Sequence, residues 1–373
     1  MNKDMRVAKL YRFDDIRVEE VPVPDVGVGD ALIKTKACGI CSGDVMPWYI
    51  EKKAPLVPGH EPVGEIVELG QKLTKSTRHS VDTARFNVGD RVFVHHHAPC
   101  MVCIYCRKGD YVQCATWRET RIIPGGISEY ILIPEINLRN DTLLLNDYIS
   151  DEDGTLVEPT ACVVKSLKRA ALRRGDTVLI IGLGVMGQIH VLLAKASGAE
   201  KVIGADMVPY RLKKAMELGA DHVIDVSKED LAERVKDVTG GLMADIVVVG
   251  PNSAQAMAEG LKAVSRGGRV LFFTPAKPGE RLEIDPNCLY FKDINIVSSY
   301  SCGPFDTREA LRLIVAGTVR AQKLVTHRFP IEKTAEAFAL TAEARDSLKS
   351  LIVFDMDSEV KQEAESSCGQ ANT

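Results

Sequence analysis

Four cysteines lie close together in the first half of the chain, and they constrain its fold more than any other feature. They are Cys100, Cys103, Cys106 and Cys114, with the spacing C-x2-C-x2-C-x7-C. Four thiolates at this spacing can converge on one tetrahedral Zn²⁺, and a shell of four sulfurs leaves no position open for a substrate. We therefore expect a structural zinc lobe at about residues 95–118.

Composition places the chain among ordinary globular proteins and excludes several other classes. Of its 373 residues, 45% are hydrophobic and 26% are charged, which is usual for a folded domain. The formal net charge is −4, so we expect neither nucleic acid nor an anionic membrane as a partner. The sequence contains no apolar run of about 20 residues that could span a bilayer.

The start of the chain, MNKDMRVAKLYRFDD, lacks the apolar core of a signal peptide. We therefore expect a cytoplasmic, reducing location. In that setting the ten cysteines are expected to be metal ligands and buried thiols rather than disulfides.

The hydrophobic pattern changes along the chain and predicts two kinds of structure. Segments between residues 6 and 133 alternate apolar and polar positions, which indicates antiparallel β-structure. From about 155 to 295, apolar strands alternate with amphipathic helices, which indicates a parallel sheet covered on both faces. The polar, basic stretch at 71–86 is expected to be an exposed loop, and the polar tail at 357–373 is expected to be disordered.

A glycine-rich turn marks a dinucleotide site within the parallel segment. Gly182, Gly184 and Gly187 follow the strand VLIIG and open a helix. The first glycine permits a tight turn, the second lets the backbone approach a pyrophosphate, and the third lets the helix pack on the strand. Val185 and Met186 stand in the first turn of that helix, whose free N–H groups favour phosphate.

An acid at the end of the next strand favours NAD as the cofactor. Asp206 lies 19 residues after Gly187, where a carboxylate can accept hydrogen bonds from the adenosine ribose. A 2′-phosphate would meet like-charge repulsion there, although Arg211 offers a cation that could accommodate it. We favour a solvated charge or an adenine-stacking role for Arg211.

A second group of metal-ligand residue types lies outside the cysteine lobe. Cys41, His60, Glu61 and Glu158 combine thiolate, imidazole and carboxylate. Three such ligands with one exchangeable position are typical of catalytic zinc. Spacing alone does not join them, because they lie in three distant segments. Asp44 is a candidate acceptor for the N–H of a ligand histidine.

The ordered set of motifs resembles a known family. The chain is similar to the zinc-dependent medium-chain dehydrogenases/reductases of the alcohol dehydrogenase superfamily, and most similar to their sorbitol (polyol) and threonine dehydrogenase branches. The resemblance extends over roughly residues 5–355. It is carried by the cysteine lobe and by CGICSGD at 38–44, VPGHEPVGEIVELG at 57–70, VGDRV at 88–92, GGISEYILIP at 125–134, LVEP at 156–159, GLGVMG at 182–187 and LVTHRFPIEK at 324–333.

This resemblance implies an α/β fold with two parts. A Rossmann domain, a doubly wound parallel sheet, is expected at 158–295. A mainly β, GroES-like catalytic domain is expected at 1–157, with the chain returning to it at 296–356. The resemblance also implies two Zn²⁺ ions per chain, one catalytic and one structural, together with NAD and a homodimeric or homotetrameric assembly.

The resemblance assigns roles residue by residue. It implies that Cys41 and His60 are ligands of the catalytic zinc. Glu61 is a direct ligand in the polyol branch, and Glu158 is a ligand or a water-mediated neighbour, so both remain candidates. Cys38 keeps its interpretation as a buried thiol. The implied reaction is the reversible oxidation of a secondary alcohol, such as a polyol or sugar, to a ketone, with hydride transfer to nicotinamide.

Three positions depart from the family pattern. The family usually places a hydroxyl two residues after the ligand cysteine, where this chain has Gly43, and often a relay histidine at the position of Met46. Ser42 is our candidate for taking the alcohol proton, with water as the alternative. Ser299 replaces an arginine usual in the polyol and threonine enzymes, which weakens both substrate assignments.

Other functions compete with this interpretation. Within the branch, the alternative is oxidation of an amino alcohol such as threonine. A zinc-free quinone or enoyl reductase would keep the glycine turn without needing Cys41, His60 and Glu61 together. A non-catalytic, zinc-stabilised NAD-binding protein is the rival from another class, and the complete ligand set argues against it.

The remaining histidines and two aromatic residues have less specific expectations. Consecutive strand residues point to opposite faces, so we expect the run at 95–97 to be a strand end rather than a shared metal site. His190 is expected to be a packing residue in its helix. Trp48 and Tyr49 follow the Cys41 motif, and either core packing or a substrate pocket would suit them.

Overall fold

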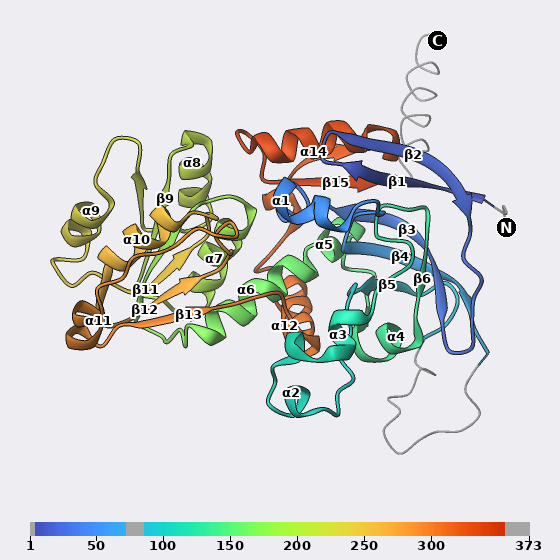
Figure 1. The fold of residues 1–373 in the computed structure, drawn as a ribbon, viewed down its shortest axis with the longest axis horizontal. Coiled ribbons are helices and arrows are strands. Elements are labelled where there is room, and N and C mark those ends of the chain that lie inside the picture. The colour runs from blue at the N-terminus through green and yellow to red at the C-terminus, as the bar shows by residue number, and fades with distance from the viewer. Residues whose placement is uncertain (1–3, 72–85, 355–373) are drawn as a thin grey trace, which may run out of the picture. The chain divides into compact units, whose positions relative to one another are not determined.

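The structure is a computed structural model that describes residues 4–71 and 86–354 (Figure 1). The predicted loop at 71–86 falls almost entirely outside the described residues, and so does the predicted disordered tail. The chain divides into two compact units. The first comprises residues 1–157, 325–343 and 349–373, and the second comprises 158–324 and 344–348.

The first unit is mainly β. Its strands are β1 (Asp4–Arg12), β2 (Asp15–Pro22), β3 (Ala31–Gly39), β4 (Glu61–Leu69), β5 (Arg91–Val94), β6 (Tyr130–Ile133), β7 (Thr142–Leu144), β14 (Val325–Phe329) and β15 (Lys349–Val353). Its helices are α1 (Pro47–Ile50), α2 (Ile104–Arg107), α3 (Ala115–Glu119), α4 (Glu135–Asp141), α5 (Asp151–Thr155) and α14 (Thr334–Glu343).

One sheet of this unit joins distant parts of the chain. Its strand order is β14-β15-β3-β4-β5-β7, with β6 also paired to β3, while β1 and β2 form a separate hairpin. β15 pairs antiparallel with β3 and therefore brings the C-terminal segment beside residues 37–39. Buried apolar side chains of β3, β4, β5 and β6, among them Ile33, Ile66, Val92 and Ile131, form one core.

The second unit is a parallel sheet with helices. Its strands are β8 (Thr177–Ile181), β9 (Lys201–Asp206), β10 (His222–Asp225), β11 (Ala244–Val249), β12 (Val264–Phe272) and β13 (Asn295–Ser298). Its helices are α6 (Val157–Arg169), α7 (Val185–Ala196), α8 (Pro209–Glu217), α9 (Leu231–Val238), α10 (Ala254–Lys262), α11 (Pro286–Lys292), α12 (Pro304–Val315) and α13 (Ala321–Leu324).

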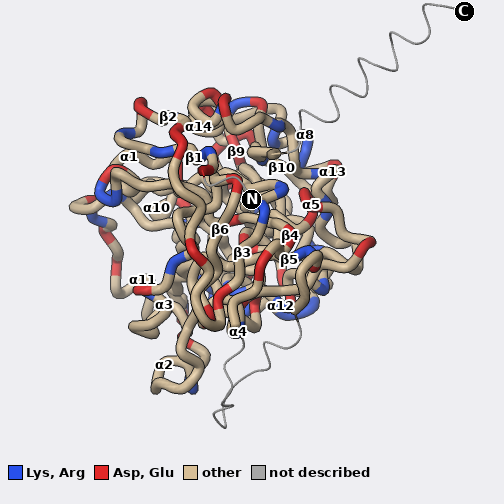
Figure 2. The backbone as a smooth tube through the Cα atoms, turned by 90° about the vertical axis from the view of Figure 1, so that its right-hand side faces the viewer, with Lys and Arg blue, Asp and Glu red and all other residues tan. Residues whose placement is uncertain are grey.

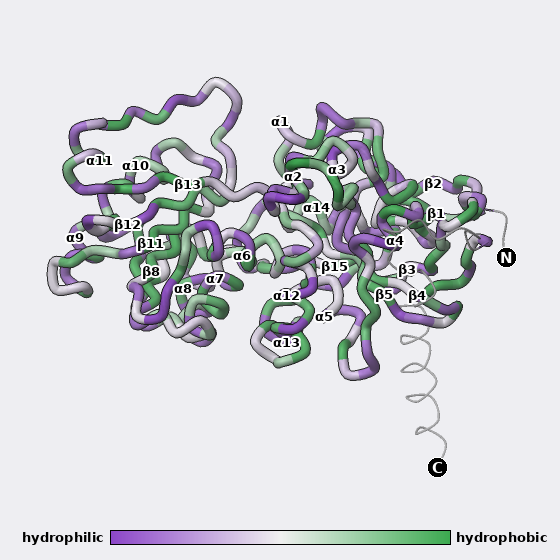
Figure 3. The backbone as a smooth tube through the Cα atoms, turned by 90° about the horizontal axis from the view of Figure 1, so that it is seen from below, coloured by the Kyte–Doolittle hydropathy of each residue, from purple (hydrophilic) through white to green (hydrophobic). Residues whose placement is uncertain are grey.

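The strand order of this sheet is β10-β9-β8-β11-β12-β13, and every pairing is parallel. In order of sequence this is 3-2-1-4-5-6, the arrangement of a doubly wound Rossmann fold. The central strands β8 and β11 are continuous apolar runs, as strands buried on both faces require, and Figure 3 shows them in the green of hydrophobic residues. The predicted α/β fold class is confirmed.

The second domain boundary differs from the prediction. The chain returns to the first unit at Val325, whereas the sequence pattern suggested residue 296. β13 pairs in parallel with β12, and α12 and α13 follow it within the second unit. The prediction failed because β13 has no buried residue. Its composition is less apolar than that of the buried parallel strands, so in the sequence it resembles an exposed strand of the mainly β domain.

Charged residues of both signs are interspersed along the tube in Figure 2, consistent with the small net charge. Among the described residues, no helix combines the length and the apolar character needed to cross a membrane.

Candidate active site

Two neighbouring strands bring three of the predicted metal ligands together. β3 ends at Gly39, β4 begins at Glu61, and these two residues are paired in the antiparallel ladder. Cys41 follows the end of β3 and His60 precedes β4, so both lie at the same end of the strand pair. The candidate ligand atoms of Cys41, His60 and Glu61 all lie within 4.8 Å of one another.

This set of donor atoms fits Zn²⁺, which accepts thiolate, imidazole and carboxylate in one shell. The backbone N–H of Gly43 donates to Cys41 Sγ at 3.3 Å. Ser42, the candidate proton acceptor, has an exposed side chain.

Asp44 contacts the ligand histidine, as its position in the motif predicts. Asp44 Oδ2 lies 3.4 Å from His60 Nδ1, and Asp44 is buried. Burial lowers the pKa of His60, but the charges and hydrogen bonds of Asp44 and Cys41 outweigh it and raise that pKa well above its usual value. Asp44 therefore fixes the orientation of the imidazole and leaves Nε2 for a metal.

A buried lysine that sequence reasoning missed contacts Glu61. Lys349, the first residue of β15, forms an ion pair with the Glu61 carboxylate, and each side chain is 1% exposed. Its ammonium also donates to the carbonyl of Ile40 at 3.0 Å. Gly39 leaves room for this pair, because a Cβ at that position would lie 1.9 Å from Glu61 Oε2.

One signal for Lys349 was present in the sequence: a lysine that opens the apolar strand KSLIV. A lysine at a strand end is usually exposed, so the pattern alone did not indicate burial.

Glu158, the fourth predicted ligand, lies in the first turn of α6 and belongs to the second unit. Its Oε1 accepts a hydrogen bond from the Cys162 thiol at 3.3 Å. Cys38 is fully buried, and burial first, then the charge of Glu61, raises its pKa to about 12. Cys38 is therefore a neutral thiol, as expected.

The four cysteines of the predicted lobe converge. Their sulfurs lie within 4.8 Å of one another, with separations of 3.9 Å for Cys100 and Cys106, 3.5 Å for Cys103 and Cys106, and 3.6 Å for Cys114 and Cys100. Zn–S bonds of about 2.3 Å give a tetrahedron with sulfur–sulfur edges of about 3.8 Å. The lobe thus has the dimensions of a four-thiolate zinc site.

The glycine turn has the geometry that a pyrophosphate requires. Gly182 has φ +87°, in the left-handed region. A Cβ on Gly187 would lie 2.0 Å from the carbonyl oxygen of Gly182, whereas a Cβ on Gly184 would meet no atom within 4 Å. Gly184 is the N-cap of α7, so the open space lies at the N-terminus of that helix, where Val185 and Met186 begin it.

Asp206 braces this turn. Its Oδ2 accepts from the backbone N–H of Leu183 at 2.7 Å, and its Oδ1 accepts from Met207 and Val208 at 2.8 and 2.9 Å. A carboxylate offers about four acceptor sites, so these three bonds leave about one for a ribose hydroxyl.

Arg211 is not the solvated charge that we expected. Its side chain is 15% exposed, and Nη1 lies 3.6 Å from Asp206 Oδ2. Its guanidinium also donates to the carbonyl of Ala344. The solvated-charge alternative was wrong because α8 presents Arg211 toward the end of β9, where the Asp206 carboxylate attracts it. The adenine-stacking role stays a prediction.

The three histidines follow the end of β5 but do not alternate between opposite faces, because their ring centroids lie 5.2 Å apart for His95 and His96 and 3.9 Å apart for His96 and His97. His95 Nδ1 lies 2.6 Å from Asp141 Oδ2, and His97 Nδ1 lies 2.7 Å from the carbonyl of Thr120. The His96 ring instead lies 4.9 Å from the His60 ring, centroid to centroid.

His190 is a packing residue with both ring nitrogens bonded. Nδ1 contacts the carbonyl of Met186 and Nε2 contacts Ser166 Oγ, each at 2.8 Å. Trp48 and Tyr49 form an edge-to-face pair in α1.

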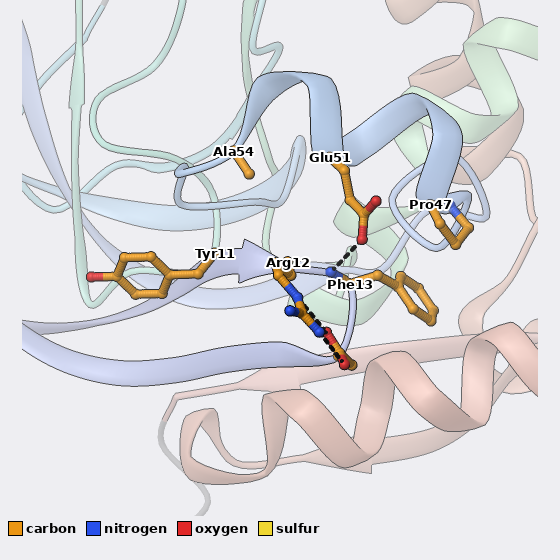
Figure 4. Close-up of a pocket in the computed structure, with 7 residues that line it drawn as sticks. Tyr11, Arg12, Phe13, Pro47, Glu51 and Ala54 are labelled. Carbon is orange, nitrogen blue, oxygen red and sulfur yellow. Dashed lines mark hydrogen bonds and ion pairs between the residues drawn. The ribbon is translucent and has the colours of Figure 1, made fainter.

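A surface pocket near the end of β1 offers no reactive set (Figure 4). The polar groups drawn there already have partners, and the Tyr11 hydroxyl donates to Glu19 Oε1 at 2.6 Å. The backbone N–H of Phe13 donates to Glu51 Oε1 at 3.1 Å, and Arg12 pairs with Asp14 at 2.7 Å. The candidate active site is therefore the cluster of Cys41, His60 and Glu61 together with the glycine turn.

Comparison with known proteins identifies the family of the chain. Residues 27–140 match the alcohol dehydrogenase GroES-like domain family, and residues 185–316 match the zinc-binding dehydrogenase family. The chain is 34% identical to L-threonine 3-dehydrogenase of Rhizobium etli, with 86% of this chain and 90% of that protein covered. It is 32% identical to sorbitol dehydrogenase of Bombyx mori, with 92% and 97% covered.

A solved structure shares the whole fold. It is a zinc-binding dehydrogenase from Sinorhizobium meliloti bound to NADP. It superposes with a TM-score of 0.82 at 26% identity, covering 94% of this chain and 99% of that chain.

Proposed function

This chain belongs to the zinc-dependent medium-chain dehydrogenases of the alcohol dehydrogenase superfamily, and from that premise we propose that it oxidises a secondary alcohol of the polyol class reversibly to a ketone, with NAD as the hydride acceptor. One observation carries the proposal: Cys41, His60 and Glu61 converge at the end of the β3–β4 pair. A zinc-free reductase of the same fold would not need that convergence.

The bound metal would act as a Lewis acid that lowers the pKa of the substrate hydroxyl, and NAD would take the hydride. Cys41, His60 and one carboxylate, Glu61 or Glu158, would hold the metal. Asp44 keeps the His60 ring in one orientation through the 3.4 Å contact. Lys349 compensates the buried charge of Glu61, so this carboxylate can remain ionised without water around it.

The proton of the alcohol needs an acceptor, and Ser42 remains our candidate with water as the alternative. A Ser42→Ala variant with unchanged kcat and pH profile would exclude Ser42. A lower kcat with unchanged zinc content would support it.

NAD preference rests on the Asp206 carboxylate at the end of β9. The negative charge of Asp206 repels a 2′-phosphate. Arg211, the cation that could bind such a phosphate, is already paired with Asp206. The solved relative bound to NADP makes a direct comparison of kcat/KM for the two cofactors necessary. A higher value with NADP would overturn the preference.

Polyol oxidation is favoured over threonine oxidation by the sorbitol dehydrogenase relative, which is covered along 97% of its length. The threonine dehydrogenase relative keeps amino-alcohol oxidation as the second candidate. Residue 299 is a buried serine, so the arginine usual at this position in both kinds of enzyme is absent from this chain.

The deciding experiment measures NAD reduction over a panel of polyols, sugars, amino alcohols and simple secondary alcohols, together with zinc per chain. We expect turnover with a polyol and two zinc ions. Cys41→Ala should abolish turnover while NAD still binds. Retained activity with one zinc per chain would overturn the proposal.

We also propose a homodimer or homotetramer. β13 is an edge strand of the parallel sheet, and its outer edge could pair with a strand of a second copy. Sedimentation of the purified chain distinguishes a monomer from these assemblies.

A further inference from the structure

One face of α6 contacts the segment that follows β13 in a regular pattern. Lys165 Nζ donates to the carbonyl of Tyr300 at 2.6 Å, and Arg169 Nε donates to the carbonyl of Ser298 at 2.6 Å. Partners thus move two residues back along the extended segment as the helix advances by one turn. The helix and the segment therefore run in opposite directions, side by side.

The same pattern places two cysteines opposite each other. Cys162 lies three residues before Lys165 and shares its helix face. Cys302 lies two residues after Tyr300, beyond a bend at Ser301. The two thiols are in hydrogen-bond contact. The Cys162 sulfur is also 3.3 Å from Glu158 Oε1, and the Cys302 sulfur lies within 4.8 Å of the nearest Glu158 oxygen.

These two thiols differ in exposure, and both lie beside Glu158, a candidate ligand of the catalytic zinc. Cys302 is completely buried, whereas Cys162 is partly exposed. The zinc lobe uses four other cysteines, and the catalytic cluster uses Cys41. A partly exposed thiol and a protected thiol beside it can form a reversible disulfide. The hydrogen bond with Cys302, burial and the charge of Glu158 raise the pKa of Cys162, which slows the first attack on a disulfide reagent.

We infer that Cys162 and Cys302 are a redox modification site, which a small-molecule disulfide converts into a disulfide bond between α6 and the segment before α12. The sulfur of Cys162 attacks one sulfur of oxidised glutathione, the S–S bond of the reagent breaks, and one reduced glutathione leaves with the proton of Cys162. The sulfur of Cys302 then attacks the Cys162 sulfur of the mixed disulfide. The second glutathione leaves with the proton of Cys302. The protein loses two electrons and two protons, and the reagent gains both.

The bond would not require the helix and the segment to move far, because the contacts of Lys165 and Arg169 already hold them together. Lys168 Nζ adds a third link, to Asp306 Oδ1 at 3.1 Å, in the first turn of α12. Oxidation would remove the S–H that Cys162 donates to Glu158. The disulfide itself does not depend on the substrate proposed above.

The test treats the reduced, zinc-loaded full chain with oxidised glutathione, blocks the remaining thiols by alkylation, and maps tryptic peptides by mass spectrometry. Trypsin leaves Cys162 as the one cysteine in residues 140–165 and Cys302 as the one cysteine in residues 293–308. We expect these two peptides to be linked in most chains and to separate after treatment with dithiothreitol. Zinc content should not change.

Two single variants check the order of events. Cys302→Ser should stop at a glutathione adduct on Cys162, because the resolving thiol is gone. Cys288→Ser, which removes a cysteine in α11, should still give the linked peptides. The inference would be overturned if both peptides of the wild type were fully alkylated, or if the linked pair formed only in urea-unfolded protein.

Discussion

The ammonium of Lys349 pairs with the carboxylate of Glu61 in a place where neither side chain reaches water. The two residues are 288 positions apart (349 − 61), and they meet because β15 pairs with β3 and β3 pairs with β4. The pair places a compensated negative charge beside Cys41 and His60. The candidate metal site therefore depends on β15, the last strand in the described part of the chain.

Replacing Lys349 tests how much its ion pair with Glu61 contributes to the stability of the folded protein. Lys349→Met should leave the Glu61 charge buried without compensation, and loss of one partner of a buried pair costs about 3–5 kcal/mol. The free energy of unfolding from urea titration of the zinc-loaded protein measures this cost. Lys333→Met, at an ion pair whose lysine is 59% exposed, is the control and should change stability by less than about 1 kcal/mol. Similar small losses in both variants would contradict the role given to Lys349.

Asp44 should control metal affinity through His60. Asp44→Asn keeps the shape of the side chain but removes the charge that faces His60 Nδ1, so zinc affinity at the catalytic site should fall about 10–100-fold. Competition with a chromophoric chelator measures it. Glu65→Gln, at a half-exposed carboxylate on β4, the strand that follows His60, should leave affinity unchanged. Equal affinities in the wild type and Asp44→Asn would show that Asp44 does not orient the ligand.

Asp206 should act on both the turn and the cofactor. Asp206→Asn keeps an oxygen for the N–H of Leu183 but removes the charge that repels a 2′-phosphate and pairs with Arg211. The ratio of kcat/KM for NAD to that for NADP should fall by about tenfold or more, equivalent to about 1.4 kcal/mol. The double variant Asp206→Asn, Arg211→Ala should lose the NADP gain. An unchanged cofactor ratio in the single variant would be the contrary result.

The buried imidazole of His190 should make stability depend on pH. Burial lowers its pKa to about 4 in the folded protein, while an unfolded histidine titrates near its usual value of about 6.5. Between these values the unfolded chain binds more protons. The contribution of His190 to the free energy of unfolding is therefore complete above about pH 6.5. It decreases as the pH falls toward 4, by up to about 1.4 kcal/mol per pH unit.

Urea titrations at pH 7 and pH 5 measure this dependence. His190→Gln can keep hydrogen bonds to Met186 and Ser166 without titrating, so its loss of stability between the two pH values should be smaller than that of the wild type. The same loss in both proteins would exclude His190 as the source.

The sequence by itself determined the features whose parts are close together in the chain. The four thiols of the lobe lie within fifteen residues, and the glycine turn is one strand–turn–helix unit, so local geometry brings their parts into contact. The alternation of strands and helices likewise predicted the Rossmann fold, because a buried parallel strand needs an apolar run that is visible in one segment.

Only the tertiary structure decided what depends on pairing between distant segments. Spacing could not join Cys41 to His60, since the β3–β4 register sets their separation. It could not show that Lys349 is buried, that Arg211 pairs with Asp206, or that the return to the first unit begins at Val325. The physical reason is common to all four: hydrophobic periodicity reports which side of an element is buried, but not which distant side chain covers it.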